Sequence, residues 1–174
     1  CTNLSINQAA NQILINSLPE LKKPVIRILE ISATSGSYTQ KAIRKYQNSC
    51  QRIEATVLFI NKTAHELSQI IFQKYFPCSE RLKLTLSTDD FLISKLGDFD
   101  VIVGLPLISK VQGQTKKDLC AEYEDNLACN TAAFITQKAL RHGDNIALFL
   151  PKYFLNNLDF IETRKAISKF QITH

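Results

Sequence analysis

Hydrophobic and polar positions follow two alternating patterns along the chain. Short runs rich in valine, isoleucine and phenylalanine predict buried strands, and apolar residues spaced three or four positions apart predict helices. The expected strands are residues 25–31, 53–60, 82–86, 99–104 and 145–150, with a sixth beginning at 170–173. The expected helices are residues 37–47, 63–75, 127–141 and 155–169, and the polar stretch 109–125 is expected to be a long loop. This alternation predicts an α/β fold with a doubly wound, mostly parallel sheet.

Local signals mark the ends of several expected helices. Thr63 with Glu66 three positions later is typical of a capping box at the start of the helix over 63–75. Helical spacing continues through that segment in Leu67, Ile70, Ile71 and Lys74. The pair His142 and Gly143 is expected to end the helix over 127–141. Residues 1–22 are expected to form an amphipathic lead-in helix whose apolar positions are Ala9, Ile13, Leu14 and Leu18.

Length and composition bound the class of protein. With 174 residues, of which 45% are hydrophobic and 21% charged, we expect one globular domain over 1–174, with a lead-in helix over 1–22 and a core over 23–174 from which the last strands could be missing. No run approaches the roughly 18 apolar residues of a membrane span, and no signal peptide is evident. The five cysteines are scattered and predict neither a metal site nor a disulfide framework, so we expect reduced thiols and a cytoplasmic protein: Cys1, Cys50, Cys78, Cys120 and Cys129.

The net charge of +5 permits nucleic-acid binding without requiring it. The lysines and arginines are spread along the chain, so an ordinary solvated surface explains them as well as a DNA-binding face does.

In a parallel sheet, ligands bind beyond the carboxyl ends of the strands, so the residues that follow each strand are the functional candidates. The first strand ends in a turn of small residues from Glu30 to Tyr38, which could let the backbone approach a ligand at a helix N-terminus. Gly36 is the single glycine of this turn, and an ordinary strand–helix turn is an equally good interpretation.

Two further strand ends carry distinctive residues. After the third strand, Asp89 and Asp90 precede Phe91, and a carboxylate beside an aromatic ring could hold an adenine amino group. A helix cap or an Asx turn built on either aspartate is the structural alternative. After the fourth strand comes Gly104-Leu105-Pro106, in which glycine permits and proline fixes backbone conformations that are unusual for other residues.

Taken in order, these segments resemble the adenine-specific DNA methyltransferases of restriction–modification systems. The resemblance covers nearly the whole chain, and its most specific part is the stretch 126–164, which contains Phe134-Ile135, Lys138-Ala139-Leu140 and Leu150-Pro151-Lys152. Residues 89–92 resemble the family's third motif, and residues 99–104 resemble the strand that enters its catalytic motif. The resemblance implies a Rossmann-like class I methyltransferase fold with S-adenosylmethionine as cofactor. The cofactor-binding positions it implies are Glu30, Ser32, Gly36, Asn61, Asp90, Phe91 and Gly104.

The sequence departs from the family at the catalytic motif. After the glycine the family has Asn or Asp, then Pro-Pro and an aromatic residue, whereas this chain has Leu105, Pro106, Leu107 and Ile108. In the family the Asn side chain and a prolyl carbonyl accept hydrogen bonds from the target amino group, and the aromatic ring stacks on the flipped base. Leu105 accepts no such bond and Ile108 has no ring.

The cofactor loop departs as well. Thr34 and Ser35 replace a glycine-containing turn, and Asn61 stands where the family usually has an acid for the ribose hydroxyls. The sequence therefore predicts a DNA adenine methyltransferase-like domain that is catalytically impaired, whose S-adenosylmethionine binding is weak or lost. A structural or DNA-positioning role beside a recognition domain or partner subunit is expected, with DNA as a partner and no membrane. Two alternatives stay open: an active methyltransferase with an atypical motif, and a protein-interaction module on this scaffold.

Overall fold

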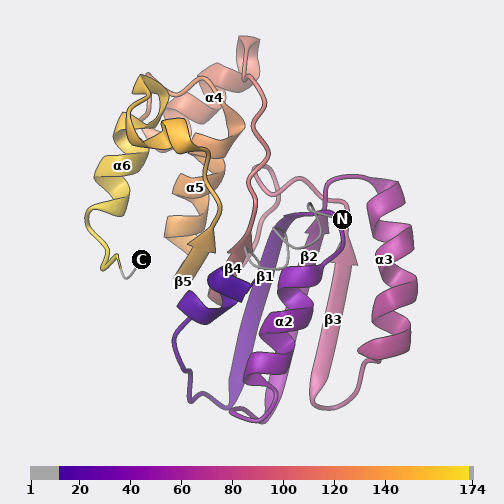
Figure 1. The fold of residues 1–174 in the computed structure, drawn as a ribbon. Coiled ribbons are helices and arrows are strands. Elements are labelled where there is room, and N and C mark those ends of the chain that lie inside the picture. Colours follow the sequence, from indigo (N-terminus) through magenta and orange to yellow (C-terminus); the bar gives the residue numbers. More distant parts are fainter. Residues whose placement is uncertain (1–11, 173–174) are drawn as a thin grey trace.

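The computed structural model describes residues 12–172 and contains a five-stranded parallel sheet (Figure 1). The strand order is β3-β2-β1-β4-β5, so the order reverses beside β1. The strands are β1 (Val25–Ala33), β2 (Arg52–Phe59), β3 (Leu82–Ser87), β4 (Phe99–Gly104) and β5 (Gly143–Leu148). Every strand pair is parallel, which confirms the predicted sheet and places all five carboxyl ends at one edge.

Helices connect the strands and continue after β5. They are α2 (Ser37–Tyr46), α3 (Lys62–Tyr75), α4 (Gly113–Tyr123), α5 (Thr131–His142) and α6 (Ile161–Ile167), with short 3-10 turns η1 (Lys152–Leu155) and η2 (Leu158–Phe160). Asn61 caps α3 by accepting a hydrogen bond from the Ala64 amide at 2.8 Å. The expected capping box on Thr63 is therefore wrong by two positions, because the asparagine already satisfies the first turn.

Two hydrophobic clusters cover the two faces of the sheet, which confirms the doubly wound fold. Alternate residues of one strand point to opposite faces, so Ile28 of β1 joins one cluster and its neighbour Leu29 joins the other. The first cluster packs the sheet against α2 and against Phe72 of α3. The second packs it against α4 and α5, around the fully buried Phe134.

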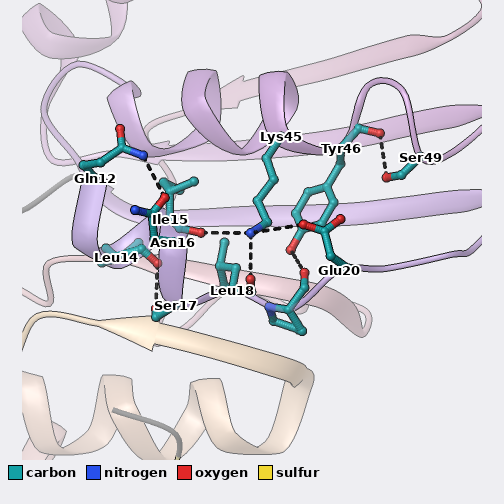
Figure 2. Close-up of polar contacts among 11 residues, drawn as sticks. Gln12, Leu14, Ile15, Asn16, Ser17, Leu18, Glu20, Lys45, Tyr46 and Ser49 are labelled. Carbon is teal, nitrogen blue, oxygen red and sulfur yellow. Dashed lines mark hydrogen bonds and ion pairs between the residues drawn. The ribbon is translucent and has the colours of Figure 1, made fainter.

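The described part of the lead-in segment is tied to α2 (Figure 2). Residues 12–17 are helical, and the Lys45 ammonium donates to the Leu18 carbonyl oxygen at 2.7 Å. The Tyr46 hydroxyl donates to the Pro19 carbonyl oxygen at 2.8 Å. Leu14, Ile15 and Leu18 are buried, whereas Ile13, which was expected on the apolar face, is exposed. Ala9 lies outside the described residues.

The expected long loop over 109–125 is wrong, because most of this segment forms α4. The helix is polar over most of its surface, and only Leu119, Cys120 and Tyr123 are buried, in the cluster around α5. Packing against α5 stabilises a helix whose own sequence shows little apolar periodicity.

The last third of the chain also differs from expectation. The helix expected from 127 begins at Thr131, where Asn130 caps it by accepting from the Ala133 amide at 3.0 Å. Gly143 opens β5, so this strand begins two residues before the predicted 145 and ends at Leu148. The single helix expected over 155–169 is divided into η1, η2 and α6, with Asn157 accepting from the Asp159 amide at 2.8 Å. Residues 170–172 form no strand, and Thr173 lies outside the described part. No helix among the described residues is long and apolar enough to cross a membrane.

Candidate functional site

A cleft of about 260 Å³ opens at the carboxyl ends of β1, β2 and β3. Three of the predicted cofactor positions line it, namely Ser32, Asp90 and Phe91. Its other walls come from the end of β2, from Leu107 and Ser109 after β4, and from Thr131 and Ile135 in the first two turns of α5. The cleft lies at the sheet edge where ligands bind in folds of this kind.

The turn that follows β3 forms one wall of the cleft. Asp90 accepts a hydrogen bond from the Leu92 amide through Oδ1 at 2.9 Å, which is the Asx turn given above as the structural alternative. Phe91 and Leu92 are both buried, and Phe91 lines the cleft. Asp90 therefore has a structural task, while its second carboxylate oxygen accepts none of the hydrogen bonds found among the described residues.

Lys138 of α5 forms hydrogen bonds with the backbone of this turn. Its side chain is buried, and its ammonium donates to the carbonyl oxygens of Leu92 at 2.9 Å and Ser94 at 2.8 Å. The ammonium also lies 5.3 Å from the centre of the Phe91 ring, within cation–π range. Burial lowers the pKa of Lys138, and the nearby Glu122 and Asp90 carboxylates oppose that shift. Lys138 thus links α5 to the aromatic wall of the cleft.

Replacing Lys138 with methionine should destabilise the fold by about 2–3 kcal/mol, because two largely buried carbonyl oxygens would lose their donor. Urea unfolding monitored by circular dichroism measures the loss. Lys95→Met is the matched control, since Lys95 is exposed on the same turn. Equal stability of the two variants would contradict the role assigned to Lys138.

Glu30 is buried inside the turn after β1 and does not line the cleft. Only 1% of its surface is exposed, and its Oε2 accepts a hydrogen bond from the Thr39 amide in the first turn of α2 at 2.7 Å. Burial raises the pKa of Glu30 to about 7, although hydrogen bonds from Thr39 and Tyr38 lower it. Glu30 therefore joins the end of β1 to α2 and shapes the turn between them.

Backbone geometry restricts the same turn at two positions. Gly36 adopts φ 67°, and a Cβ atom added there would lie 2.4 Å from the Phe72 ring. Ser32 also has a positive φ, 54°, beside an irregularity in the pairing of β1 with β2. A positive φ is uncommon for a serine and is frequent at binding sites. Ser32 lines the cleft, whereas Gly36 packs against α3 and does not.

The backbone of the segment after β4, which borders the cleft, is constrained at both of its ends. Gly104 has φ 155°, and a Cβ atom there would lie 2.4 Å from the Ile31 carbonyl oxygen, so β1 and β4 approach too closely for any other residue. Beyond the turn, Ser109 exchanges backbone and side-chain hydrogen bonds with Thr131, whose hydroxyl also donates to the Leu107 carbonyl oxygen. These bonds fix the Leu107 side chain in the cleft wall.

Residues 105–108, which stand where the resembling family has its catalytic motif, differ in their surroundings. Pro106 is buried, Leu107 lines the cleft, and Leu105 and Ile108 are about half exposed, at 51% and 49%.

Four of the predicted cofactor positions surround the site without lining the cleft: Glu30, Gly36, Asn61 and Gly104. Three residues of the site and its support were not predicted from the sequence: Thr131, Ile135 and Lys138. The available signal for Lys138 was its position as the single charged residue in the mainly uncharged stretch 131–140. Among the described residues, no group of three or more His, Cys, Asp or Glu side chains could hold a metal ion.

Comparison with solved structures relates this geometry to known proteins. A class I S-adenosylmethionine-dependent methyltransferase described as putative, from Listeria monocytogenes, superposes with a TM-score of 0.67 over 97% of this chain and 51% of its own, at 14% identity. The chain has the class I methyltransferase fold. The methyltransferase subunit of a type I restriction–modification system from Streptococcus thermophilus matches with a TM-score of 0.66 over 92% of this chain and 37% of its own, at 18% identity.

A third match has a bound cofactor. Magnesium protoporphyrin IX methyltransferase from Synechocystis PCC 6803, solved with S-adenosylmethionine, gives a TM-score of 0.53 over 98% of this chain and 72% of its own, at 15% identity. The chain spans about half of the Listeria protein and little more than a third of the Streptococcus subunit. No protein-family model and no curated protein matches the sequence.

Proposed function

We propose that this chain is a DNA adenine methyltransferase-like domain that does not catalyse methyl transfer and has a structural or DNA-positioning role in a restriction–modification system or a related complex. The observation that supports this most is the composition of the turn after β4. Leu105 offers no hydrogen-bond acceptor at the position where the resembling family holds the target amino group, and Ile108 offers no ring for the flipped base.

No residue from Leu105 to Ser109 carries an amide or carboxylate side chain that could replace the lost acceptor. The Ser109 amide and carbonyl are bonded to Thr131, and the Thr131 hydroxyl donates to Leu107. The apolar side chain of Leu107 forms part of the cleft wall instead. A missing acceptor and a missing stacking ring would each cost on the order of a hundredfold or more in rate.

The residues around the cleft fit S-adenosylmethionine poorly. Thr34 and Ser35 stand in the turn after β1 where the resembling family has glycine, so side chains occupy positions at which the backbone would approach the cofactor. The side-chain oxygen of Asn61 is engaged at the start of α3, so the usual carboxylate for ribose hydroxyls has no equivalent there. Weak or absent cofactor binding is therefore part of the proposal.

The proposed partners are DNA and a recognition domain or partner subunit. Support comes from the likeness to the Streptococcus thermophilus methyltransferase subunit and from the net charge of +5. Binding of a DNA duplex would distinguish this role from that of a plain protein-interaction module. The second candidate is an active methyltransferase with an atypical motif, which is favoured by the meeting of Ser32, Asp90 and Phe91 in one cleft.

Titration calorimetry with S-adenosylmethionine and S-adenosylhomocysteine tests the cofactor part of this proposal. We expect no binding, or dissociation constants of about 1 mM or weaker. Leu107→Ala should strengthen binding, because it removes an apolar side chain from the cleft wall. Leu105→Ala is the matched control, since Leu105 is exposed and does not line the cleft. A micromolar or tighter dissociation constant for the unaltered chain would favour the active enzyme.

A further inference from the structure

Helix α3 carries an apolar stripe on its outer surface. Leu67, Ile70, Ile71 and Tyr75 are exposed at 62%, 65%, 38% and 60%. Ile70 and Ile71 are three and four residues after Leu67, and Tyr75 is four after Ile71, so the four side chains lie on one side of the helix. They place four large apolar side chains on one exposed side of a single helix, and such a patch often marks an interaction surface.

The orientation of α3 explains why this stripe is uncovered. An amphipathic helix normally turns its apolar stripe toward the core. In α3 the buried residues are Ser68 and Phe72, so the helix contacts the sheet through the side next to the stripe. The helix lies at the outer end of the molecule beside the edge strand β3 (Figure 1). The apolar spacing that predicted this helix therefore belongs to its exposed side and not to its contact with the sheet.

Charged residues on α3 make the stripe complementary to itself. Glu66 lies toward the amino end and Lys74 eight residues later, on the i, i+4 row that passes through Ile70, and both are exposed. In an antiparallel pair of identical helices, the same rows meet, and Glu66 of each copy lies opposite Lys74 of the other. Glu66 is already 3.6 Å from Lys62 within its own helix, and this exposed pair leaves the carboxylate accessible to a second cation.

We propose that a second copy of this chain covers the stripe, with α3 packed antiparallel on α3 about a two-fold axis near Ile70. Such an isologous contact uses the same patch on both subunits. The stripe has four large side chains, far fewer than the roughly 20–30 residues that one partner contributes to a standard interface, so the dimer is weak and depends on concentration. Because α3 begins at the edge that holds the cleft, the two clefts lie at opposite ends of the interface.

Sedimentation velocity of the chain over roughly 1–500 μM tests the proposal, since this range spans the affinities of small interfaces. We expect the weight-average mass to rise from monomer toward dimer. Ile70→Glu should leave a monomer at every concentration, because a charge would be buried in the interface. Ile93→Glu is the matched control: Ile93 is 79% exposed but lies outside α3, so this variant should dimerise like the unaltered chain. Circular dichroism checks that each variant is folded.

The charge pair tests the antiparallel arrangement. Glu66→Lys and Lys74→Glu should each weaken dimerisation several-fold, and the double variant should restore it, because the pairs reform with opposite sign. A chain that stays monomeric throughout, or a dimer that Ile70→Glu leaves unchanged, would overturn the proposal. A double variant as weak as the single ones would refute the antiparallel pairing.

Discussion

Rebuilding the catalytic turn together with the cofactor loop should give this chain methyltransferase activity on DNA. The variant combines Leu105→Asn, Leu107→Pro and Ile108→Tyr with Thr34→Gly, and a DNA-recognition domain is supplied. Asparagine restores the acceptor for the amino group, tyrosine restores the stacking ring, and glycine frees the turn after β1. Each regained contact is expected to contribute on the order of a hundredfold in rate. Transfer of labelled methyl groups from S-adenosylmethionine to adenine measures the gain.

The triple variant that retains Thr34 is the matched control for the cofactor loop. We expect it to remain at the background rate, because Thr34 still stands in the turn after β1 where the resembling family has glycine. Activity in the triple variant would show that the cofactor loop is intact. Silence of the fourfold variant, with its fold verified, would show that the defect extends beyond these four positions.

The free energy of unfolding should fall as the pH rises from about 5 to 8, because of Glu30. The pKa of its carboxyl is raised to about 7 in the folded chain, from 4.5 in the unfolded chain. The folded state therefore binds the proton more tightly, and its contribution to stability is complete below pH 4.5 and is lost as the pH passes through 7. A shift of this size corresponds to on the order of 3 kcal/mol.

Urea unfolding across this pH range measures the effect. Glu30→Gln should remove most of the pH dependence and make the chain more stable than the unaltered protein at pH 8, since the amide oxygen can still accept from the Thr39 amide. Glu80→Gln is the control, because Glu80 is exposed between α3 and β3. A Glu30→Gln variant with an unchanged pH profile would contradict the assignment.

The sheet was predictable from sequence because the central strands β1, β2 and β4 are short runs whose apolar side chains are mostly buried, while the edge strand β3 alternates apolar and polar residues. Strands buried on both faces, such as β4, show this as a continuous apolar run. Helix α4 could not be predicted in this way, because its three buried residues are selected by contact with α5 rather than by periodicity along the helix. Tertiary packing decided its conformation.

The candidate site was predictable in outline only. In a parallel sheet the carboxyl ends of the strands lie at one edge, so residues after different strands were expected to converge. Ser32, Asp90 and Phe91 do meet in one cleft. The presence of Leu107 in the wall depends on the hydrogen bonds between Ser109 and Thr131, one between backbone groups and one to the Thr131 hydroxyl, and these residues lie far apart in the sequence. Sequence spacing carries no information about such a bridge, nor about the two carbonyl oxygens that Lys138 reaches.

The most direct test of the central claim is the transfer of labelled methyl groups from S-adenosylmethionine to DNA by the unaltered chain, with a recognition domain supplied. The claim rests on Leu105, which places an apolar side chain where an amide or carboxylate must accept the amino-group hydrogen. We predict no label on DNA above the background without protein. Robust labelling of adenine by the unaltered chain would contradict the account.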